Sequence, residues 1–410
     1  MKLFSKGISV FLTVALILLF TCFTLSSPAA AAEKPKNLIL GCIPDMTGPY
    51  AAIVGPAYAA FTDAAEYVNS TGGIKGVPLK VDVRDCGGKV DKGVNIYMEF
   101  REMKPRPSMI YGVLSGLGEA LKQRLNEDKM PARWVCSTEV IYPPMYTFGA
   151  YPTYADLCGL FIDWVAETWK EKRPPRLAFL TWDTTYGKAV LYPVVMDYAK
   201  SKGVEVVATE LFGVRDVDLT SQLTRIKAKK ADWIFTNTAG RGPVLVAKAA
   251  REMGLKARVA GSIGLDDSCL YIDKEAFEGA VTVHPFAGWV ETKNKGIQLM
   301  NKYIKKNKRK PTYRTIMYPM GFTGVLVFKE VVERVVNKMG WDKLSGEAIK
   351  KEWEKMKDFN ADDIAIFSYT PKRHSPNMAK VFEVKGGKWV PITKMKKCPS
   401  LVPAKYKQYR

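Results

Sequence analysis

The sequence predicts an α/β protein with two doubly wound parallel sheets. Apolar runs with the length of strands alternate with helical patterns of ten or more residues through both halves of the chain. A Pro-containing loop interrupts this alternation near Ala150, and the same rhythm then starts again. A chain of 410 residues is long enough for two domains with full cores.

Residues 1–32 have the pattern of a secretion signal. Two lysines precede the apolar stretch 8–20, and small residues follow as far as Ala32. We expect cleavage after Ala32, which predicts an exported, periplasmic protein. The alternatives are a lipoprotein with Cys22 as its lipidated residue and an uncleaved anchor.

The first predicted unit is a strand, a Gly- and Pro-rich loop, a helix and a second strand. The apolar run 37–43 predicts a buried strand, the loop covers 41–56, and a helix with one apolar face follows. The strand over 79–85 completes the unit. Such an arrangement places backbone donors at the ligand side of a parallel sheet.

The same reasoning assigns the other elements. In the first half we expect helices over 91–103 and 119–126, and strands over 108–113 and 133–136. In the second half we expect strands over 177–182, 204–209, 233–237, 258–262 and 280–283, with helices over 154–170, 219–229, 243–253 and one ending at 202. Helices over 294–307, 321–339 and 346–357 then precede strands over 364–369, 379–384 and 389–392. We expect the basic end, 394–410, to be a surface tail.

Charge and cysteine content narrow the function classes. The formal net charge is +21, but the charges are scattered along predicted helix faces without a recognition motif, so nucleic acid is not an expected partner. None of the cysteines lies in a CxxC motif. Cys42 and Cys86 end two strands that we expect to be neighbours and are the best disulfide pair; the alternative is that both are small buried apolar residues.

Motifs for catalysis are missing from the sequence. The chain has two histidines, no GxSxG elbow and no GxxxxGK[ST] loop. Asp266, Asp267 and Asp273 do not have the spacing of an EF-hand loop. We therefore expect neither an enzyme nor a metal or cofactor site.

Four pieces in order and spacing carry a family resemblance: Asp45-Met-Thr-Gly-Pro49, Gly55, Asn69-x-x-Gly-Gly-Ile-x-Gly76 and Val81-x-Val-x-Asp85. Together they resemble the opening of the periplasmic branched-chain-amino-acid-binding proteins, the solute receptors of ABC importers. The resemblance extends over about 37–391.

The resemblance implies the type I periplasmic binding protein fold, with two lobes joined by a three-strand hinge. The N-terminal lobe would comprise 33–150 and 285–367, and the C-terminal lobe 151–284 and 368–393. The implied partners are a small-molecule ligand and an ABC permease in the inner membrane, and the implied state is a monomer. A sensor protein of the same fold is the alternative function.

The resemblance implies that the turn at Ser115 and Gly116 binds the ligand's carboxylate. Free N–H groups and the helix dipole at that position also suit an anion, although an ordinary N-cap would look the same. Ser137 and Thr138 follow the next strand and would contact the same head group or cap a loop. From the opening loop, Tyr50 and Val54 would line the apolar end of the pocket.

In the second lobe we expect Tyr186 to cover the ligand and Trp182 to form a flat wall, with core packing as the alternative. The turn with Ala239 and Arg241 follows another strand, and Arg241 would favour an anion. Phe286 would extend the apolar lining or belong to the core.

Ile263 departs from the family pattern. Receptors for amino acids carry an acid at the matching position, where it pairs with the ligand's ammonium group, and an unpaired buried ammonium is costly. The sequence therefore predicts a ligand with a carboxylate or similar head and an apolar or aromatic body that needs no α-ammonium. The alternative is an ordinary branched-chain amino acid, with Asp266 as the acid.

Overall fold

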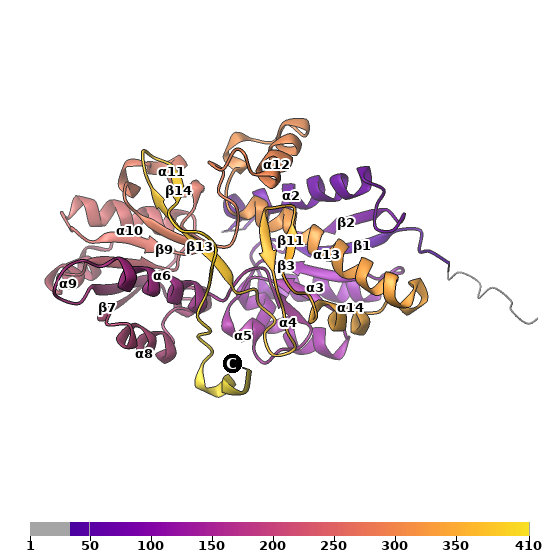
Figure 1. Ribbon diagram of the computed structural model, residues 1–410, viewed down its shortest axis with the longest axis horizontal. Coiled ribbons are helices and arrows are strands. Elements are labelled where there is room, and N and C mark those ends of the chain that lie inside the picture. Colours follow the sequence, from indigo (N-terminus) through magenta and orange to yellow (C-terminus); the bar gives the residue numbers. More distant parts are fainter. Residues whose placement is uncertain (1–32, 49, 410) are drawn as a thin grey trace, which may run out of the picture.

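The computed structural model describes residues 33–409 apart from Pro49, so the predicted leader, 1–32, and Cys22 lie outside the described residues. The chain forms two α/β lobes, each built on one main sheet and lying side by side (Figure 1). The predicted fold class, two lobes with mainly parallel sheets, is confirmed.

The first lobe contains a five-stranded parallel sheet in the order β2-β1-β3-β4-β5. Its strands are β1 (Leu38–Ile43), β2 (Leu79–Val83), β3 (Met109–Gly112), β4 (Ala132–Trp134) and β5 (Thr147–Gly149). Every residue of β1 is buried, which explains its continuous apolar sequence.

Helices from distant parts of the sequence cover this sheet. They are α2 (Ala51–Ser70), α3 (Val90–Glu102), α4 (Ser115–Glu127), α5 (Thr138–Ile141), α12 (Lys295–Lys306), α13 (Met317–Met339) and α14 (Gly346–Trp353). The small hairpin of β11 (Phe359–Ala361) and β12 (Ala365–Phe367) lies beside α13. Because α2 packs closely against α13, both ends of the chain contribute to one core.

The second lobe contains an eight-stranded sheet. Its parallel part is β7 (Glu205–Phe212), β6 (Arg176–Trp182), β8 (Trp233–Thr236), β9 (Arg258–Gly261) and β10 (Val281–His284), in that spatial order. β13 (Met378–Val384) pairs antiparallel with β10, and β14 (Trp389–Pro391) and β15 (Lys396–Lys397) each pair with β13. The covering helices are α6 (Tyr154–Thr168), α7 (Thr185–Lys188), α8 (Pro193–Ser201), α9 (Thr220–Ala228), α10 (Arg241–Glu252) and α11 (Asp267–Asp273).

The chain passes between the two sheets three times. It leaves the first sheet after β5, returns after β10 to the helices that cover that sheet, and enters the second sheet again before β13. These three connections form the hinge. The lobe boundaries at residues 150, 284 and 367 stay a prediction.

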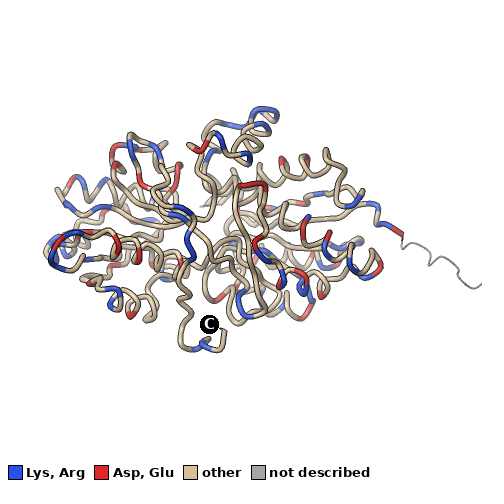
Figure 2. Tube along the Cα trace, in the orientation of Figure 1, with Lys and Arg blue, Asp and Glu red and all other residues tan. Residues whose placement is uncertain are grey.

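Basic and acidic positions are interspersed over both lobes (Figure 2). None of the helices within 33–409 combines the length and apolarity that a membrane span requires.

The structure corrects the expected disulfide, because Cys42 and Cys86 are both free and buried. The register explains this: Cys42 lies opposite Val83, and the Cys86 N–H donates to Pro44 O. Cys86 is therefore displaced along the strand direction from Cys42, at about 3.3 Å per residue. Buried apolar packing, the alternative that the sequence left open, is what both side chains do.

The structure also corrects the expected surface tail. Beyond β14 the chain forms β15, and Cys398, Leu401 and Val402 are buried. A short 3₁₀ helix, η4 (Ala404–Tyr409), completes the described chain. Apolar residues interspersed among lysines anchor this segment, which the charge pattern alone concealed.

Candidate ligand-binding site

A cavity of about 270 Å³ lies between the two lobes. Every loop that follows β1 to β5 contributes to it from one side, and the loops after β6, β8 and β9 contribute from the other. The carboxyl ends of parallel strands are the usual ligand side of such sheets. The apolar residues that line it are Ile53, Val54, Val90, Val113, Leu114, Leu117, Val135, Ala239, Ile263 and Met317.

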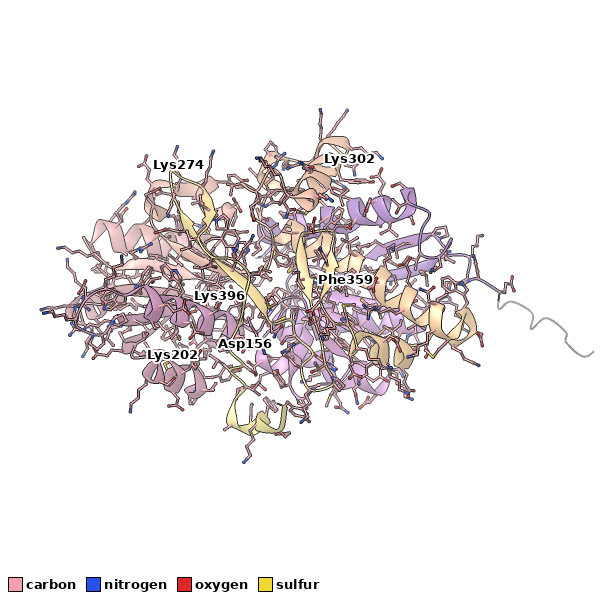
Figure 3. The ribbon with its side chains drawn as sticks, viewed as in Figure 1. Asp156, Lys202, Lys274, Lys302, Phe359 and Lys396 are labelled. Atoms are coloured by element: carbon pink, nitrogen blue, oxygen red, sulfur yellow. The ribbon has the colours of Figure 1, made fainter. Side chains whose placement is uncertain are left out.

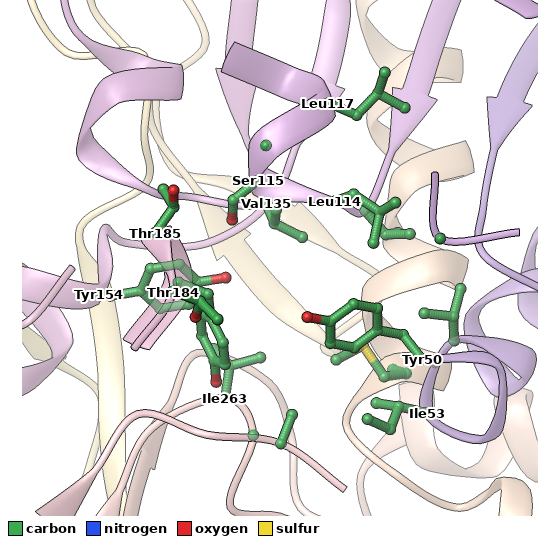
Figure 4. Close-up of a pocket in the computed structure, with 18 of the residues that line it drawn as sticks. Tyr50, Ile53, Leu114, Ser115, Leu117, Val135, Tyr154, Thr184, Thr185 and Ile263 are labelled. Atoms are coloured by element: carbon green, nitrogen blue, oxygen red, sulfur yellow. The ribbon is translucent and has the colours of Figure 1, made fainter. Parts of the chain in front are cut away.

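Ser115 and Gly116 form the first turn of α4, directly after β3. The side chain of Leu114, the N-cap residue, makes no capping hydrogen bond. The Gly118 N–H donates to Leu114 O at 3.0 Å. The N–H groups of the residues that precede Gly118 lie at the N-terminal end of α4, where the helix dipole favours a negative charge. Figure 4 shows the Ser115 hydroxyl turned toward the cavity. This turn can bind a carboxylate.

Two carboxylates hold the opening loop that carries Tyr50. Asp45 accepts the N–H of Gly48 at 2.6 Å and that of Tyr50 at 2.8 Å. Asp85 accepts the N–H of Met46 at 2.6 Å. Both acids belong to the motif that carries the resemblance. Their hydrogen bonds hold the loop in place, and the Tyr50 hydroxyl points into the cavity (Figure 4).

The turn after β6 supplies Thr184, Thr185 and Tyr186. Thr184 caps α7 by accepting the N–H of Gly187 at 3.0 Å. The Tyr186 hydroxyl donates to Thr238 O at 3.1 Å, which ties this turn to the turn after β8. A side chain at Gly264 would place its Cβ 1.9 Å from Thr238 O and 2.7 Å from the Tyr186 hydroxyl, so only glycine fits there.

Tyrosines form one wall of the cavity. The hydroxyls of Tyr151 and Tyr154 are 2.7 Å apart, and the rings of Tyr154 and Tyr186 meet edge to face with centroids 4.8 Å apart. Burial raises the pKa of Tyr154 and of Tyr186 above the usual range. Tyrosine hydroxyls are protonated at neutral pH in any case, and the raised pKa keeps them so. The Tyr186 hydroxyl gives its proton to Thr238 O and can only accept a hydrogen bond from a ligand.

No Asp, Glu, Lys, Arg or His is among the described residues that line the cavity. Ile263 contributes an apolar, 2% exposed side chain at the position where the family resemblance implies an acid. Polar recognition is left to hydroxyls and to backbone N–H groups. Such a lining offers a negative head group donors but offers an ammonium group no charged partner.

Asp266 is engaged elsewhere. Its Oδ1 accepts the N–H of Ser268 at 3.0 Å, and its Oδ2 accepts the N–H of Ile316 at 2.9 Å. Burial raises the pKa of Asp266, and these hydrogen bonds oppose the rise. The carboxylate joins α11 to the segment before α13 and does not line the cavity.

The structure brings together about half of the residues predicted for the site. Those that line the cavity are Tyr50, Val54, Ser115, Gly116, Tyr186, Ala239 and Ile263. Those that do not are Ser137, Thr138, Trp182, Arg241, Asp266 and Phe286.

The residues outside the lining have physical reasons for their positions. Ser137 is buried and donates to Glu119 Oε1 at 3.1 Å, and Thr138 begins α5 with 1% exposure. Trp182 lies behind Tyr50, at 6.5 Å between ring centroids, and lines a separate groove that also contains Arg241. Phe286 is fully buried.

A family profile described as periplasmic binding protein matches residues 39–388. The chain belongs to this family. A Leu/Ile/Val-binding protein of Rhizobium johnstonii is 22% identical over 255 residues, which cover 60% of this chain and 67% of the relative. The resemblance inferred from the opening motifs is thereby confirmed.

Solved structures of the family share the fold. A branched-chain amino acid ABC transporter protein from Thermus thermophilus with bound valine matches with a TM-score of 0.81 and 20% identity, over 90% of this chain and 98% of that one. A fatty acid ABC transporter substrate-binding protein from Thermomonospora curvata matches with a TM-score of 0.79 and 21% identity, over 92% and 97%. Proteins of this family are binding proteins, and membership implies an exported protein.

The sequence did not predict several of the residues that line the cavity of this protein. The missed polar residues are Tyr151, Tyr154, Thr184 and Thr185. Thr184 and Thr185 lie between Trp182 and Tyr186, which were both predicted for the site, so the signal was present. Tyr151 and Tyr154 lie at the first connection between the lobes, where an aromatic residue looks like core. Val90, Val113 and Leu117 have ordinary apolar positions that carry no signal.

Proposed function

We propose that the protein is the solute receptor of an ABC importer and that it closes its two lobes on a small ligand with a carboxylate head and an apolar or aromatic body. One observation carries this proposal: the cavity between the lobes has a helix N-terminus and hydroxyl groups at its polar end, and none of its described lining residues is charged. The ligand therefore needs no α-ammonium. An ABC permease of the inner membrane is the partner to which the receptor delivers it.

The relatives support the carboxylate and the apolar body, and they differ in the ammonium group. Their names give leucine, isoleucine and valine, bound valine, and a fatty acid as ligands. All of these carry a carboxylate and an apolar chain, while the fatty acid lacks an amino group. The cavity of this chain offers features for the shared parts, namely Ser115 and Gly116 for the head and Val54, Leu117 and Met317 for the chain.

A thermal-shift panel tests binding. Leucine, valine, 4-methylpentanoate, phenylacetate and the uncharged amide of 4-methylpentanoate are added to the mature protein. A ligand that binds only the folded state raises the melting temperature. We expect the two acids to raise it and the amide to raise it less. If neither acid shifts the transition, the proposed ligand class is wrong.

Uptake tests the transport role. Cells without this chain should take up the acid identified by the panel more slowly than cells with it, and a plasmid copy should restore the rate. Unchanged uptake would instead favour a sensor of the same fold.

A further inference from the structure

The last segment of the described chain lies beyond the family match, which ends at residue 388. This clasp segment, 394–409, leaves the second sheet at β15, runs along α6 and ends against α5 (Figure 1). It therefore contacts both lobes.

Its first part is fixed to α6 of the second lobe. The Leu401 N–H donates to Asp156 Oδ1 at 2.7 Å, and Lys396 forms an ion pair with Glu167. Figure 3 labels Asp156 and Lys396 near the junction of the lobes. A Cβ at Gly159 would lie 2.8 Å from Leu401 Cδ1, so the segment lies directly on the helix.

Its second part is fixed to α5 of the first lobe. The Tyr406 hydroxyl donates to Glu139 Oε2 at 2.7 Å, and Lys405 Nζ lies 2.9 Å from Glu139 Oε1. The rings of Tyr406 and Tyr409 pack on Tyr142, with centroid distances of 6.0 and 6.1 Å.

Glu139 also contacts the second lobe directly. Its Oε1 accepts a hydrogen bond of 3.2 Å from the hydroxyl of Tyr192, the N-cap residue of α8. Below it, the buried Lys122 donates to the carbonyl oxygens of Glu139 and Tyr142 and holds α5 in place. One carboxylate thus receives hydrogen bonds from the opposite lobe and from the clasp segment.

Glu139 is close in sequence to a residue that lines the ligand cavity. Glu139 follows β4 by a few residues, and Val135 of the same turn lines the cavity. A contact that crosses between lobes exists only when they are close together, so it stabilises the closed arrangement over the open one.

We propose that Glu139 is a positioning residue that, together with the clasp segment, holds the lobes in the arrangement that completes the ligand cavity. The proposal rests on the proposed function only in taking closure as the step that encloses the ligand. It assigns a task to 394–409, which the family match does not cover.

Distance measurement between spin labels tests the proposal without any ligand. Labels are placed at Ala120→Cys on α4 and Lys200→Cys on α8, both exposed, in the mature chain; its described native cysteines are all buried. Glu139→Gln and Tyr406→Phe are compared with the parent. In each variant we expect the fraction of molecules with a long distance between the two labels to rise about threefold. This is the size of effect expected when a partly exposed contact to Glu139 is lost.

Lys407→Ala is the matched control, because Lys407 is an exposed lysine in the same 3₁₀ helix. It should leave the distribution unchanged. The double variant Lys405→Ala, Tyr406→Phe leaves Glu139 intact and should reproduce the shift. If the variants keep the far-ultraviolet circular dichroism of the parent and its distance distribution, the proposal is wrong. Failure of 4-methylpentanoate to bind the parent would instead count against the proposed function.

Discussion

At the scale of residues, the proposed recognition depends on a few uncharged groups. Ser115 and Gly116 present a helix end, Tyr50 and Tyr154 present hydroxyls, and Ile263 stands where the family resemblance implies an acid. The polar end of the cavity therefore suits a negative head group, because the helix N-terminus offers N–H donors and no Asp or Glu is among the described lining residues.

Replacing Ser115 by alanine tests this head-group site. The variant loses one hydrogen bond to a charged group, which is worth roughly 1.5–3 kcal/mol, so the affinity for 4-methylpentanoate should fall at least tenfold. Thr138→Val is the matched control: Thr138 is the buried first residue of α5 and does not line the cavity, so its variant should bind normally. Calorimetry gives both affinities. Equal losses in the two variants would show that Ser115 acts through stability rather than contact.

The sequence predicted which residues lie in turns after strands, but it did not predict where their side chains point. The sequence placed Ser115, Tyr186 and Ile263 at such turns, and all three line the cavity. It placed Trp182 and Arg241 at equivalent turns, but their side chains line the neighbouring groove instead. Which way a side chain points after a strand depends on the packing of the next helix, and a single sequence does not encode that packing locally.

At the scale of elements, the close approach of backbones and the burial of side chains determine how the helices pack against one another. A Cβ at Gly321 of α13 would lie 2.3 Å from the carbonyl oxygen of Ala57 in α2, so this pair of helices depends on the missing side chain. The strand and helix rhythm predicted these elements well because their periodicity is local. The clasp segment was missed because its anchoring residues belong to contacts with distant helices.

Gly321→Ala should destabilise the first lobe. Overpacking of this kind costs about 1–3 kcal/mol, measured as the free energy of unfolding in urea. Gly55→Ala on α2 is the control, since its nearest neighbouring atom would be the Tyr313 hydroxyl at 3.9 Å. That variant should be neutral or gain up to about 1 kcal/mol from helix propensity. Similar losses in both would mean that the close approach is not the cause.

Asp156 makes the stability of α6 depend on pH. Burial raises the pKa of its carboxyl group to about 6. The folded protein then binds this proton more tightly than the unfolded chain does, so the contribution to stability is present at low pH and is lost as pH rises through about 4 to 6.

Asp156→Asn should remove that dependence and keep an acceptor for the Leu401 N–H. Relative to the parent, the free energy of unfolding of the variant should rise by about 2 kcal/mol between pH 4 and pH 7. Urea denaturation at several pH values measures this difference. Two parallel pH profiles would show that Asp156 is not the titrating group.

At the scale of the whole molecule, the two lobes form one binding device. Both sheets direct the carboxyl ends of their parallel strands at the cavity, and three connections join the lobes, as the proposed closure requires. The sequence predicted this architecture, because the alternating pattern runs through both halves of the chain and the family resemblance extends over about 37–391. It did not predict the contacts across the lobes, such as Asp266 with Ile316, since these join residues far apart in sequence.

The central claim is that the ligand needs no α-ammonium group. Calorimetry with leucine and with 4-methylpentanoate, which share the same carbon chain and carboxylate, tests it most directly. The absence of a charged partner in the described cavity lining predicts that the acid binds at least ten times more tightly, which corresponds to about 1.4 kcal/mol. Tighter binding of leucine, abolished by Asp266→Asn, would contradict the claim and would make Asp266 the ammonium partner.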